Sequence, residues 1–185
     1  MEVVEVRWHG RGGRGVVLAY RIIAKAAFLE GKWSQAFPFF GAERRGAPVT
    51  AFTRIANSEI RLRSQVYEPD VVVVVDPSQL GSPRVLEGLK PSGILLANAK
   101  TPPSELPGEA SKKASVDATG IALSLGLRVA GLPVPNTAMA GAFARATGLV
   151  SLDSVLEAIR SILKGKAVEV NLRAAEMAYE KTEIA

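Results

Sequence analysis

The chain has 185 residues, of which 48% are hydrophobic, and a formal net charge of +5. This length and composition predict one globular domain with its own hydrophobic core. The sequence contains no cysteine, which excludes disulfides, thiolate nucleophiles and a conventional iron–sulfur cluster ligated by this chain. Because His9 is the only histidine, a zinc site of the usual kind is not expected.

The positive charge is concentrated in the first third of the chain. Residues 1–63 contain nine Arg and two Lys against five Glu, whereas residues 64–185 are close to neutral. Arginine favours bidentate recognition of phosphate or carboxylate, so an anionic ligand or partner is expected. The sequence lacks a basic run or a recognisable nucleic-acid motif, and we expect no nucleic-acid partner.

No stretch of the sequence approaches the roughly 18 consecutive apolar residues that cross a bilayer. The N-terminal residues also lack the basic, apolar and cleavage regions of a signal peptide. We therefore expect a cytoplasmic protein that does not insert into a membrane.

The first elements predict a strand, a glycine loop and a helix. Residues 3–7 alternate and are rich in Val, which predicts a strand. Apolar residues recur at helical spacing over 16–29. Between them lies the loop HGRGGRG at 9–15.

The region after this helix predicts a loop followed by a hairpin. Residues 31–48 are rich in Gly, Pro and aromatic residues, and no regular structure is expected there. Residues 50–55 and 59–63 flank Asn57-Ser58, which predicts a β-hairpin.

The remainder of the chain alternates between strands and helices. The five valines at 71–75 predict a central parallel strand covered on both faces. A helix at 79–89, a strand at 93–97, a loop at 101–108, a strand at 114–116 and helices at 117–126, 137–147, 152–164 and 171–183 should follow. We expect Asn136 and Ser151 to cap two of these helices. This order predicts a single three-layer α/β/α domain over 1–185, with a mixed, mostly parallel central sheet.

The glycine loop is a candidate anion site. A helix N-terminus presents N–H groups and partial positive charge, and glycines let the backbone approach a phosphate closely. Arg11 and Arg14 could add charge-assisted contacts. The alternative is a turn that only permits tight packing of strand against helix. The loop matches the dinucleotide fingerprint G-x-G-x-x-G poorly and lacks the expected acidic ribose partner, so NAD is not favoured.

A second candidate segment, FPFFGAERRGAP, lies at 37–48. Phe37, Phe39 and Phe40 are too many aromatic residues for a solvated loop, and Arg44 and Arg45 follow them. The composition is typical of a subunit interface, which we favour over a ligand clamp.

Three other polar residues could have either a structural or a functional role. A lone His9 beside a loop is more often structural than a general base. Asp76 and Asn98 end strands at the edge where α/β sheets bind ligands, although a helix cap is the commoner role. The sequence shows no Walker loop, nucleophile elbow or acid–base pair, so we predict no catalytic residue and no metal ligand in this chain.

The loop at 9–15 resembles the H-G-R-G-G-Q-G loop of gamma subunits of 2-oxoacid:ferredoxin oxidoreductases. The similarity continues through 37–48, 51–55, 60–63, 67–70 and the valine strand at 71–75, and then at Asn98, 117–119 and Asn136. Arg14 departs from this pattern, since Gln is commoner there, and adds a charge to the loop. The likeness is greatest to the pyruvate or 2-ketoisovalerate enzymes of anaerobic archaea and bacteria.

The resemblance implies a subunit of an enzyme that oxidatively decarboxylates a 2-oxoacid, with pyruvate expected, forms an acyl-coenzyme A and reduces ferredoxin. It places thiamine diphosphate, Mg²⁺ and iron–sulfur clusters on other subunits, and implies alpha, beta and delta-type partners. It links the gamma subunit to assembly and to coenzyme A.

We therefore predict that the loop recognises a coenzyme A phosphate, with Arg44 and Arg45 either assisting or holding a neighbouring subunit. The predicted loop residues are Gly10, Arg11, Gly12, Gly13, Arg14 and Gly15. Two alternatives stay open, namely a purely structural subunit without ligand contact and a stand-alone nucleotide-binding module.

Overall fold

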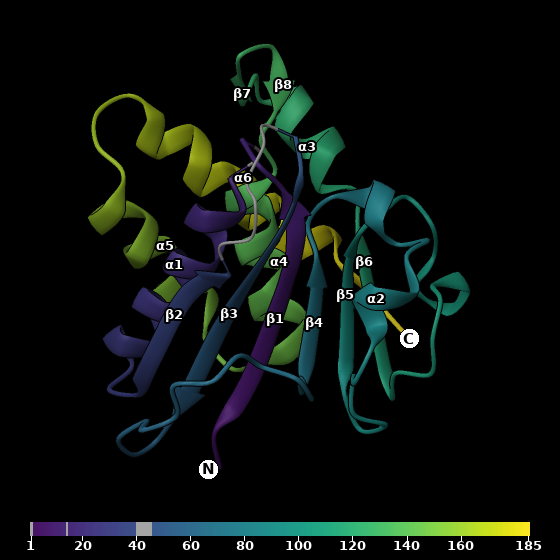
Figure 1. Ribbon diagram of the computed structural model, residues 1–185. Helices are drawn as coiled ribbons and strands as arrows, with labels where there is room; N and C mark the ends of the chain where they lie inside the picture. The colour runs from purple at the N-terminus through teal and green to yellow at the C-terminus, as the bar shows by residue number, and fades with distance from the viewer. Residues whose placement is uncertain (1, 14, 40–45) are drawn as a thin grey trace.

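The computed structural model describes residues 2–13, 15–39 and 46–185. Its central feature is a seven-stranded sheet with the strand order β2-β3-β1-β4-β5-β6-β9 (Figure 1). The strands are β1 (Val4–Arg11), β2 (Trp33–Phe39), β3 (Pro48–Ala56), β4 (Val71–Val74), β5 (Ile94–Asn98), β6 (Lys112–Val116) and β9 (Glu183–Ile184). A separate small hairpin joins β7 (Arg128–Val129) to β8 (Leu132–Pro133).

The sheet is mixed, with most of its strands running in one direction. Strands β1, β4, β5 and β6 pair in parallel. Strand β3 is antiparallel to both β1 and β2, so β2 runs in the same direction as β1. Strand β9 is antiparallel to β6. The predicted mixed, mostly parallel sheet is confirmed.

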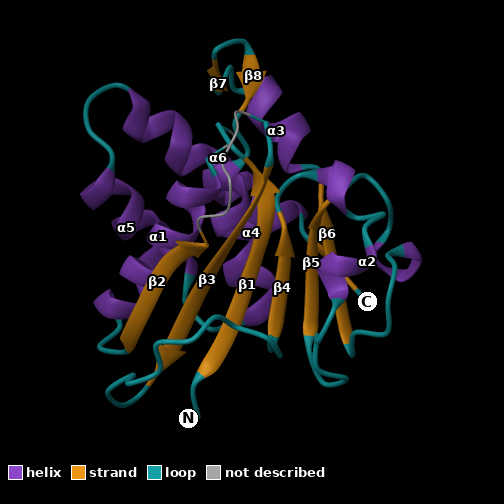
Figure 2. Ribbon diagram, in the orientation of Figure 1, coloured by secondary structure: helices purple, strands orange, loops and turns teal. Residues whose placement is uncertain are grey.

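Helices cover the two faces of the sheet unequally (Figures 1 and 2). Behind the sheet lie α1 (Val16–Leu29), α4 (Asn136–Thr147), α5 (Leu152–Ile162) and α6 (Ala167–Lys181), while α3 (Ala118–Ser124) packs beside α4 and α6. In front lies the short α2 (Pro83–Leu86), and the 3₁₀ turns are η1 (Pro77–Gln79) and η2 (Pro103–Glu105). The predicted α/β/α layering is confirmed, with a thick rear layer and a thin front layer. None of the helices in the described part of the chain combines the length and apolar content that crossing a membrane requires.

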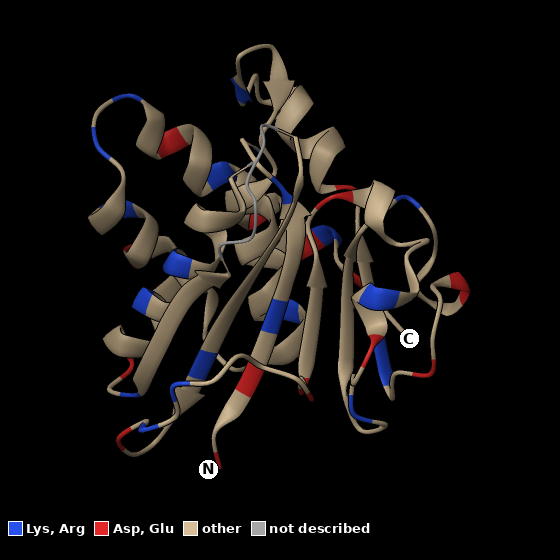
Figure 3. Cartoon of the chain, in the orientation of Figure 1, with Lys and Arg blue, Asp and Glu red and all other residues tan. Residues whose placement is uncertain are grey.

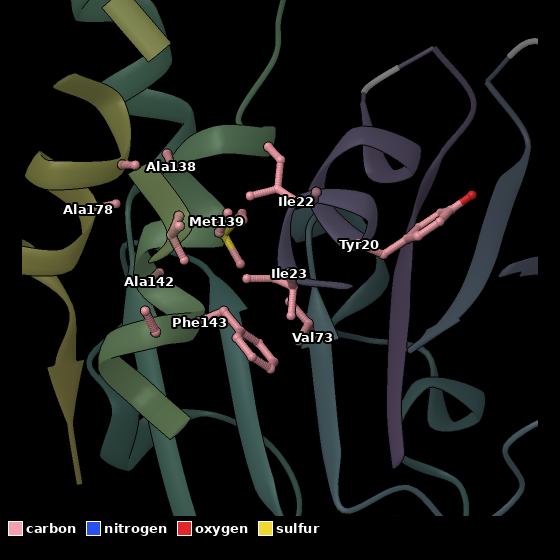
Figure 4. Packing of buried hydrophobic residues seen from close by; sticks show 14 of the residues in the cluster. Tyr20, Ile22, Ile23, Val73, Ala138, Met139, Ala142, Phe143 and Ala178 are labelled. Atoms are coloured by element: carbon pink, nitrogen blue, oxygen red, sulfur yellow. The ribbon is translucent and has the colours of Figure 1, made fainter. Parts of the chain in front are cut away.

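The larger core fills the space between the sheet and the rear helices. Trp8 of β1 stacks on Phe143 of α4 with their ring centroids 5.5 Å apart. Figure 4 shows Met139 and Phe143 directed from α4 toward Ile22 and Ile23 of α1. Helix packing against an apolar sheet face therefore gives most of the buried apolar surface.

A smaller core lies on the front face, under α2. Val72 and Val74 of β4 belong to it, whereas Val71 and Val73 point into the rear core. The valine strand is thus buried on both faces, as its sequence predicted.

The predicted hairpin of 50–55 with 59–63 is wrong. Strand β3 pairs instead with β2, in a region where no regular structure was expected. Alternate residues Gln35, Phe37 and Phe39 of β2 share one face of the sheet, and Pro38 is tolerated because β2 is an edge strand. Residues 57–63 are almost wholly exposed and carry too little apolar surface to form a strand in this sheet.

Two helices differ from their predicted bounds for local reasons. The predicted helix at 79–89 is reduced to η1 and α2, because Gly81, Pro83 and Gly88 interrupt it. Helix α6 begins at Ala167, four residues before its predicted start. The Ser151 side chain caps α5 by accepting a hydrogen bond from the amide of Ser154 at 3.1 Å, as predicted. Asn136 is instead the first residue of α4, and Pro135 occupies the cap position.

Candidate functional site

The segment predicted as a glycine loop is only partly a loop, because β1 runs beyond its predicted end and includes His9, Gly10 and Arg11. The rest of the segment connects this strand to α1, which begins at Val16. Two glycines of the segment are required by packing. A Cβ on Gly10 would lie 2.0 Å from Cγ2 of Val16, and one on Gly15 would lie 2.6 Å from Nδ2 of Asn136. Both distances are far below a van der Waals contact, so these glycines allow β1, α1 and the start of α4 to meet.

Gly13 differs from these two glycines because no packing contact with the described residues requires it. Its φ is +78°, and apart from its chain neighbours no atom of the described residues lies within 4 Å of the position that a Cβ would take. The positive φ favours glycine, and the described residues leave the space beside it open. This open space lies at the N-terminal end of α1, whose first turn contains no acidic residue and whose cap residue Gly15 offers no side chain. A helix end of this kind attracts an anion.

Arg11 is tied to the neighbouring strand rather than left free in solvent. Its Nε lies 3.2 Å from Oδ2 of Asp76, and its Nη2 donates to Oγ of Ser78 at 3.0 Å. Its Nη1 donates to the carbonyl of Gly46 at 3.0 Å, and the amide of Gly12 donates to the carbonyl of Ala47 at 3.0 Å. These contacts join the glycine loop to residues 46–47 and to the end of β4.

Asp76 and Asn98 serve structural roles at the carboxyl edge of the sheet. Asp76 caps η1, because its Oδ1 accepts hydrogen bonds from the amide and hydroxyl of Ser78 at 2.9 and 2.7 Å. The Asn98 amide group donates to the carbonyl of Val75 and to the hydroxyl of Thr119, at 2.9 and 2.8 Å.

Sequence reasoning missed two residues that support the loop. Ser78 accepts hydrogen bonds from Arg11, and the Gln79 side chain donates to the carbonyl of Gly10. Both follow the valine strand directly. Because the carboxyl ends of parallel strands meet at one edge, this position was the available signal.

His9 is buried in a pair with Arg7. The Arg7 Nε donates to Nε2 of His9 at 3.0 Å, and Nη2 of Arg7 donates to the backbone carbonyls of Val85 and Glu87. Burial, and then the positive charge of Arg7, lower the pKa of His9 to about 3. A histidine with such a pKa is a weak base at neutral pH, which favours a structural role for His9 over that of a general base.

Three of the predicted site residues, Arg14, Arg44 and Arg45, lie outside the described residues. Of the aromatic residues predicted beside them, Phe37 packs on Phe52 with ring centroids 5.3 Å apart. The guanidinium of Arg54 lies 5.6 Å from the Phe37 ring centroid. Figure 3 shows basic positions on β1, β3 and α1 rather than in one cluster. Across the described ranges, no group of three or more acidic or histidine side chains could hold a metal ion.

Comparisons with known proteins agree with the resemblance seen in the glycine loop. A family model described as pyruvate ferredoxin/flavodoxin oxidoreductase matches residues 5–181. The chain is 56% identical over 186 residues to the pyruvate/ketoisovalerate oxidoreductases common subunit gamma of Pyrococcus furiosus, with 98% of each chain covered. It is 53% identical over 179 residues to the pyruvate synthase subunit PorC of Methanocaldococcus jannaschii, with 97% of each chain covered.

A solved structure shows the same fold over the whole chain. The crystal structure of pyruvate oxidoreductase subunit PORC from Thermotoga maritima matches with a TM-score of 0.84 and 39% identity. The match covers 100% of this chain and 99% of that one. The chain therefore belongs to the pyruvate ferredoxin/flavodoxin oxidoreductase family, as a gamma-type subunit.

Proposed function

We propose that this chain contributes a phosphate-binding site for coenzyme A to a pyruvate:ferredoxin oxidoreductase. The complete enzyme would oxidatively decarboxylate the 2-oxoacid, transfer the acyl group to coenzyme A and pass two electrons to ferredoxin. The gamma subunit would act within that enzyme together with alpha, beta and delta-type subunits. Family membership favours this role over a stand-alone nucleotide-binding module.

The observation that carries the proposal is the open space beside Gly13. Packing accounts for Gly10 and Gly15, but among the described residues no neighbouring atom accounts for the glycine at position 13. A ligand oxygen could approach the backbone there without a side chain of the described residues in its way, at the positive end of a 14-residue helix. The loop fits one phosphate of coenzyme A, which carries a pyrophosphate and a 3′-phosphate.

Arg11 has N–H donors left with which it could bind the same phosphate. Its described contacts use each of the three guanidinium nitrogens, and its side chain is 32% exposed. A guanidinium has five N–H donors in a fixed plane, so further donors remain for an anion. Arg14, Arg44 and Arg45 belong to the same proposal by their positions in the sequence.

The redox chemistry belongs to other subunits in this proposal. The chain has no cysteine for an iron–sulfur cluster. We expect thiamine diphosphate, Mg²⁺ and the clusters to be bound elsewhere in the complex. Bound coenzyme A would supply the thiol that accepts the acyl group, and this chain would hold one of its phosphates.

Gly13→Ala in the assembled enzyme tests the proposal, with Gly31→Ala as its matched control. Both glycines have a positive φ, of +78° and +77°, and both have open space where a Cβ would lie. The backbone strain of the two variants is therefore alike, about 1–2 kcal/mol. Gly13→Ala should raise the KM for coenzyme A by roughly tenfold, the loss of about one hydrogen bond to a charged group, whereas Gly31→Ala should not.

The readout is steady-state kinetics on complexes of equal subunit composition. An equal KM for coenzyme A in both variants would contradict the phosphate contact and leave a purely structural subunit. The KM for the 2-oxoacid serves as an internal reference, since this loop is not proposed to touch that substrate.

A further inference from the structure

A second cleft lies on the front face of the sheet, apart from the open space beside Gly13. Its volume is about 720 Å³, within the range of small-molecule sites. The floor is formed by β1 and β3, and one wall is formed by residues 82–88. Arg11 lies at its rim, but Gly12, Gly13 and Gly15 do not line it.

Arg7 brings a buried positive charge to the floor of this cleft. Arg7 is only 8% exposed. Burial lowers the pKa of its guanidinium, and the negative charge of Glu87 partly offsets this effect. Its hydrogen-bond acceptors are His9 and two backbone carbonyls, and no carboxylate of the described residues forms an ion pair with it. A buried cation without a paired anion is costly, so an incoming anion would be stabilised there.

His9 adds a donor whose direction is fixed by Arg7. The residue is 7% exposed, and its Nε2 accepts the hydrogen bond from Arg7. A neutral imidazole that accepts at Nε2 must carry its proton at Nδ1. No residue in the described ranges accepts a hydrogen bond from Nδ1, and His9 lines the cleft.

The rest of the lining defines the body of a ligand. Arg84 adds a second positive charge to the wall, and Glu87 is the one acidic residue among the described lining residues. Tyr67, which is 70% exposed, supplies aromatic surface, and the buried side chains of Phe52 and Val66 lie behind it along the lining. The cleft therefore combines convergent donors for an anion with surface for a flat, apolar group.

We propose that this cleft binds a small organic anion, with its carboxylate or phosphate on Arg7 and Nδ1 of His9 and its flat body against Tyr67. The site is independent of the proposed phosphate contact at Gly13. The Gly13→Ala variant should therefore bind the same anion as well as the parent chain does.

The single histidine makes the test direct. The imidazole nitrogen signals in a ¹⁵N NMR spectrum of the full chain can come only from His9. At neutral pH the free protein should show the Nδ1–H tautomer. Titration with phenyl phosphate should shift the Nδ1 signal in a saturable manner, inorganic phosphate should bind more weakly, and uncharged phenol should leave the signal unchanged.

Arginine variants test whether phenyl phosphate binds in this cleft. Arg7→Met should weaken phenyl phosphate binding by roughly 10- to 100-fold, since it removes a charged hydrogen-bond donor. Arg84→Met at the wall should weaken it by a smaller factor, and this variant keeps the Arg7–His9 pair if Arg7→Met does not fold. Arg128→Met, the same change at an exposed position on β7, should have no effect.

Several results would overturn the proposal. These are an Nε2–H tautomer, no saturable shift at millimolar phenyl phosphate, or an equal affinity of the parent and Arg7→Met proteins. If Arg7→Met does not fold, an equal affinity of the parent and Arg84→Met proteins has the same meaning. A shift that appears only when the other subunits are added would show that the acceptor is a protein carboxylate, and a small-ligand site would then be wrong.

Discussion

At the scale of single residues, two buried basic side chains on the front face of the sheet differ in their charge state. Arg54 is fully buried and forms an ion pair with Glu5 at 2.8 Å, with further hydrogen bonds to Gln35 and the carbonyl of Ser64. Among the described residues, Arg7 is the charged group that contacts His9, and two adjacent buried side chains that both carry positive charge repel each other. His9 therefore remains neutral, and protonating it opposes folding.

This predicts a loss of stability in mild acid. The folded pKa of His9 is about 3, against 6.5 for the ordinary group. Between these values the unfolded chain binds more protons, so the free energy of unfolding falls as the pH drops, by up to about 1.4 kcal/mol per pH unit. The contribution of neutral His9 to the free energy of unfolding is therefore complete above pH 6.5, and it is lost as the pH falls toward 3.

Urea unfolding of the parent and His9→Gln proteins at pH 7 and pH 5 measures this effect. His9→Gln keeps a polar side chain but does not titrate. Its loss of stability between the two pH values should be smaller than that of the parent by about 2 kcal/mol. Equal losses in the two proteins would contradict the assignment to His9.

At the scale of elements, the rear layer depends on the close approach of α4 to α6. A Cβ on Gly141 would lie 2.0 Å from the backbone carbonyl oxygen of Ala175. The facing residues Ala138 and Ala178 are also small, as Figure 4 shows. Backbone atoms cannot move aside as a side chain can, so the spacing of these helices is fixed by residue size.

Gly141→Ala should therefore destabilise the chain, by about 1–3 kcal/mol for overpacking. Gly81→Ala is the matched control, because its Cβ would meet no atom of the described chain within 4 Å and its φ is not positive. Gly81→Ala should be neutral or slightly stabilising. Thermal unfolding of the isolated chain compares the two, and similar midpoints would contradict the argument.

The elements also show what the sequence could predict. Helix α1 was predicted over 16–29 and begins and ends at those residues, because helical periodicity is local. The valine strand was predicted because a run of five β-branched residues is also a local signal. The strand that pairs with β3 was not predicted, since the choice between 33–39 and 59–63 depends on the rest of the sheet. The turn between the first strand and α1 was predicted, but its start was not, because β1 continues to Arg11 by pairing with β3. The packing role of Gly10 and Gly15 was not predictable either, since it depends on Val16 and Asn136.

At the scale of the whole molecule, β2 forms one edge of the sheet. Two large residues of this strand are exposed, Trp33 at 52% and Phe39 at 45%. Phe28 on the neighbouring α1 is exposed at 63%. Edge strands are commonly protected in native proteins, and aromatic residues are enriched in interfaces. This edge is therefore our candidate for contact with another subunit.

Trp33→Ser should weaken assembly without unfolding the chain. A surface substitution changes stability by about 0.5 kcal/mol or less, whereas a buried interface tryptophan contributes about 2 kcal/mol or more to binding. Val129→Ser is the control, because Val129 is 60% exposed on β7, away from this edge. Co-purification with the other subunits provides the measurement, and unchanged recovery of both variants would remove the β2 edge from the interface.

The two tryptophans give the chain a pair of built-in optical reporters. Trp8 is fully buried, donates from Nε1 to the hydroxyl of Thr53 at 3.1 Å and stacks on Phe143, whereas half of Trp33 faces solvent. A soluble quencher should reach the indole of Trp33 and not that of Trp8. In a Trp33→Phe variant, the remaining fluorescence comes from Trp8 and should report unfolding of the core alone. In the parent chain, a fluorescence change confined to the quenchable fraction should report a change at the β2 edge of the sheet.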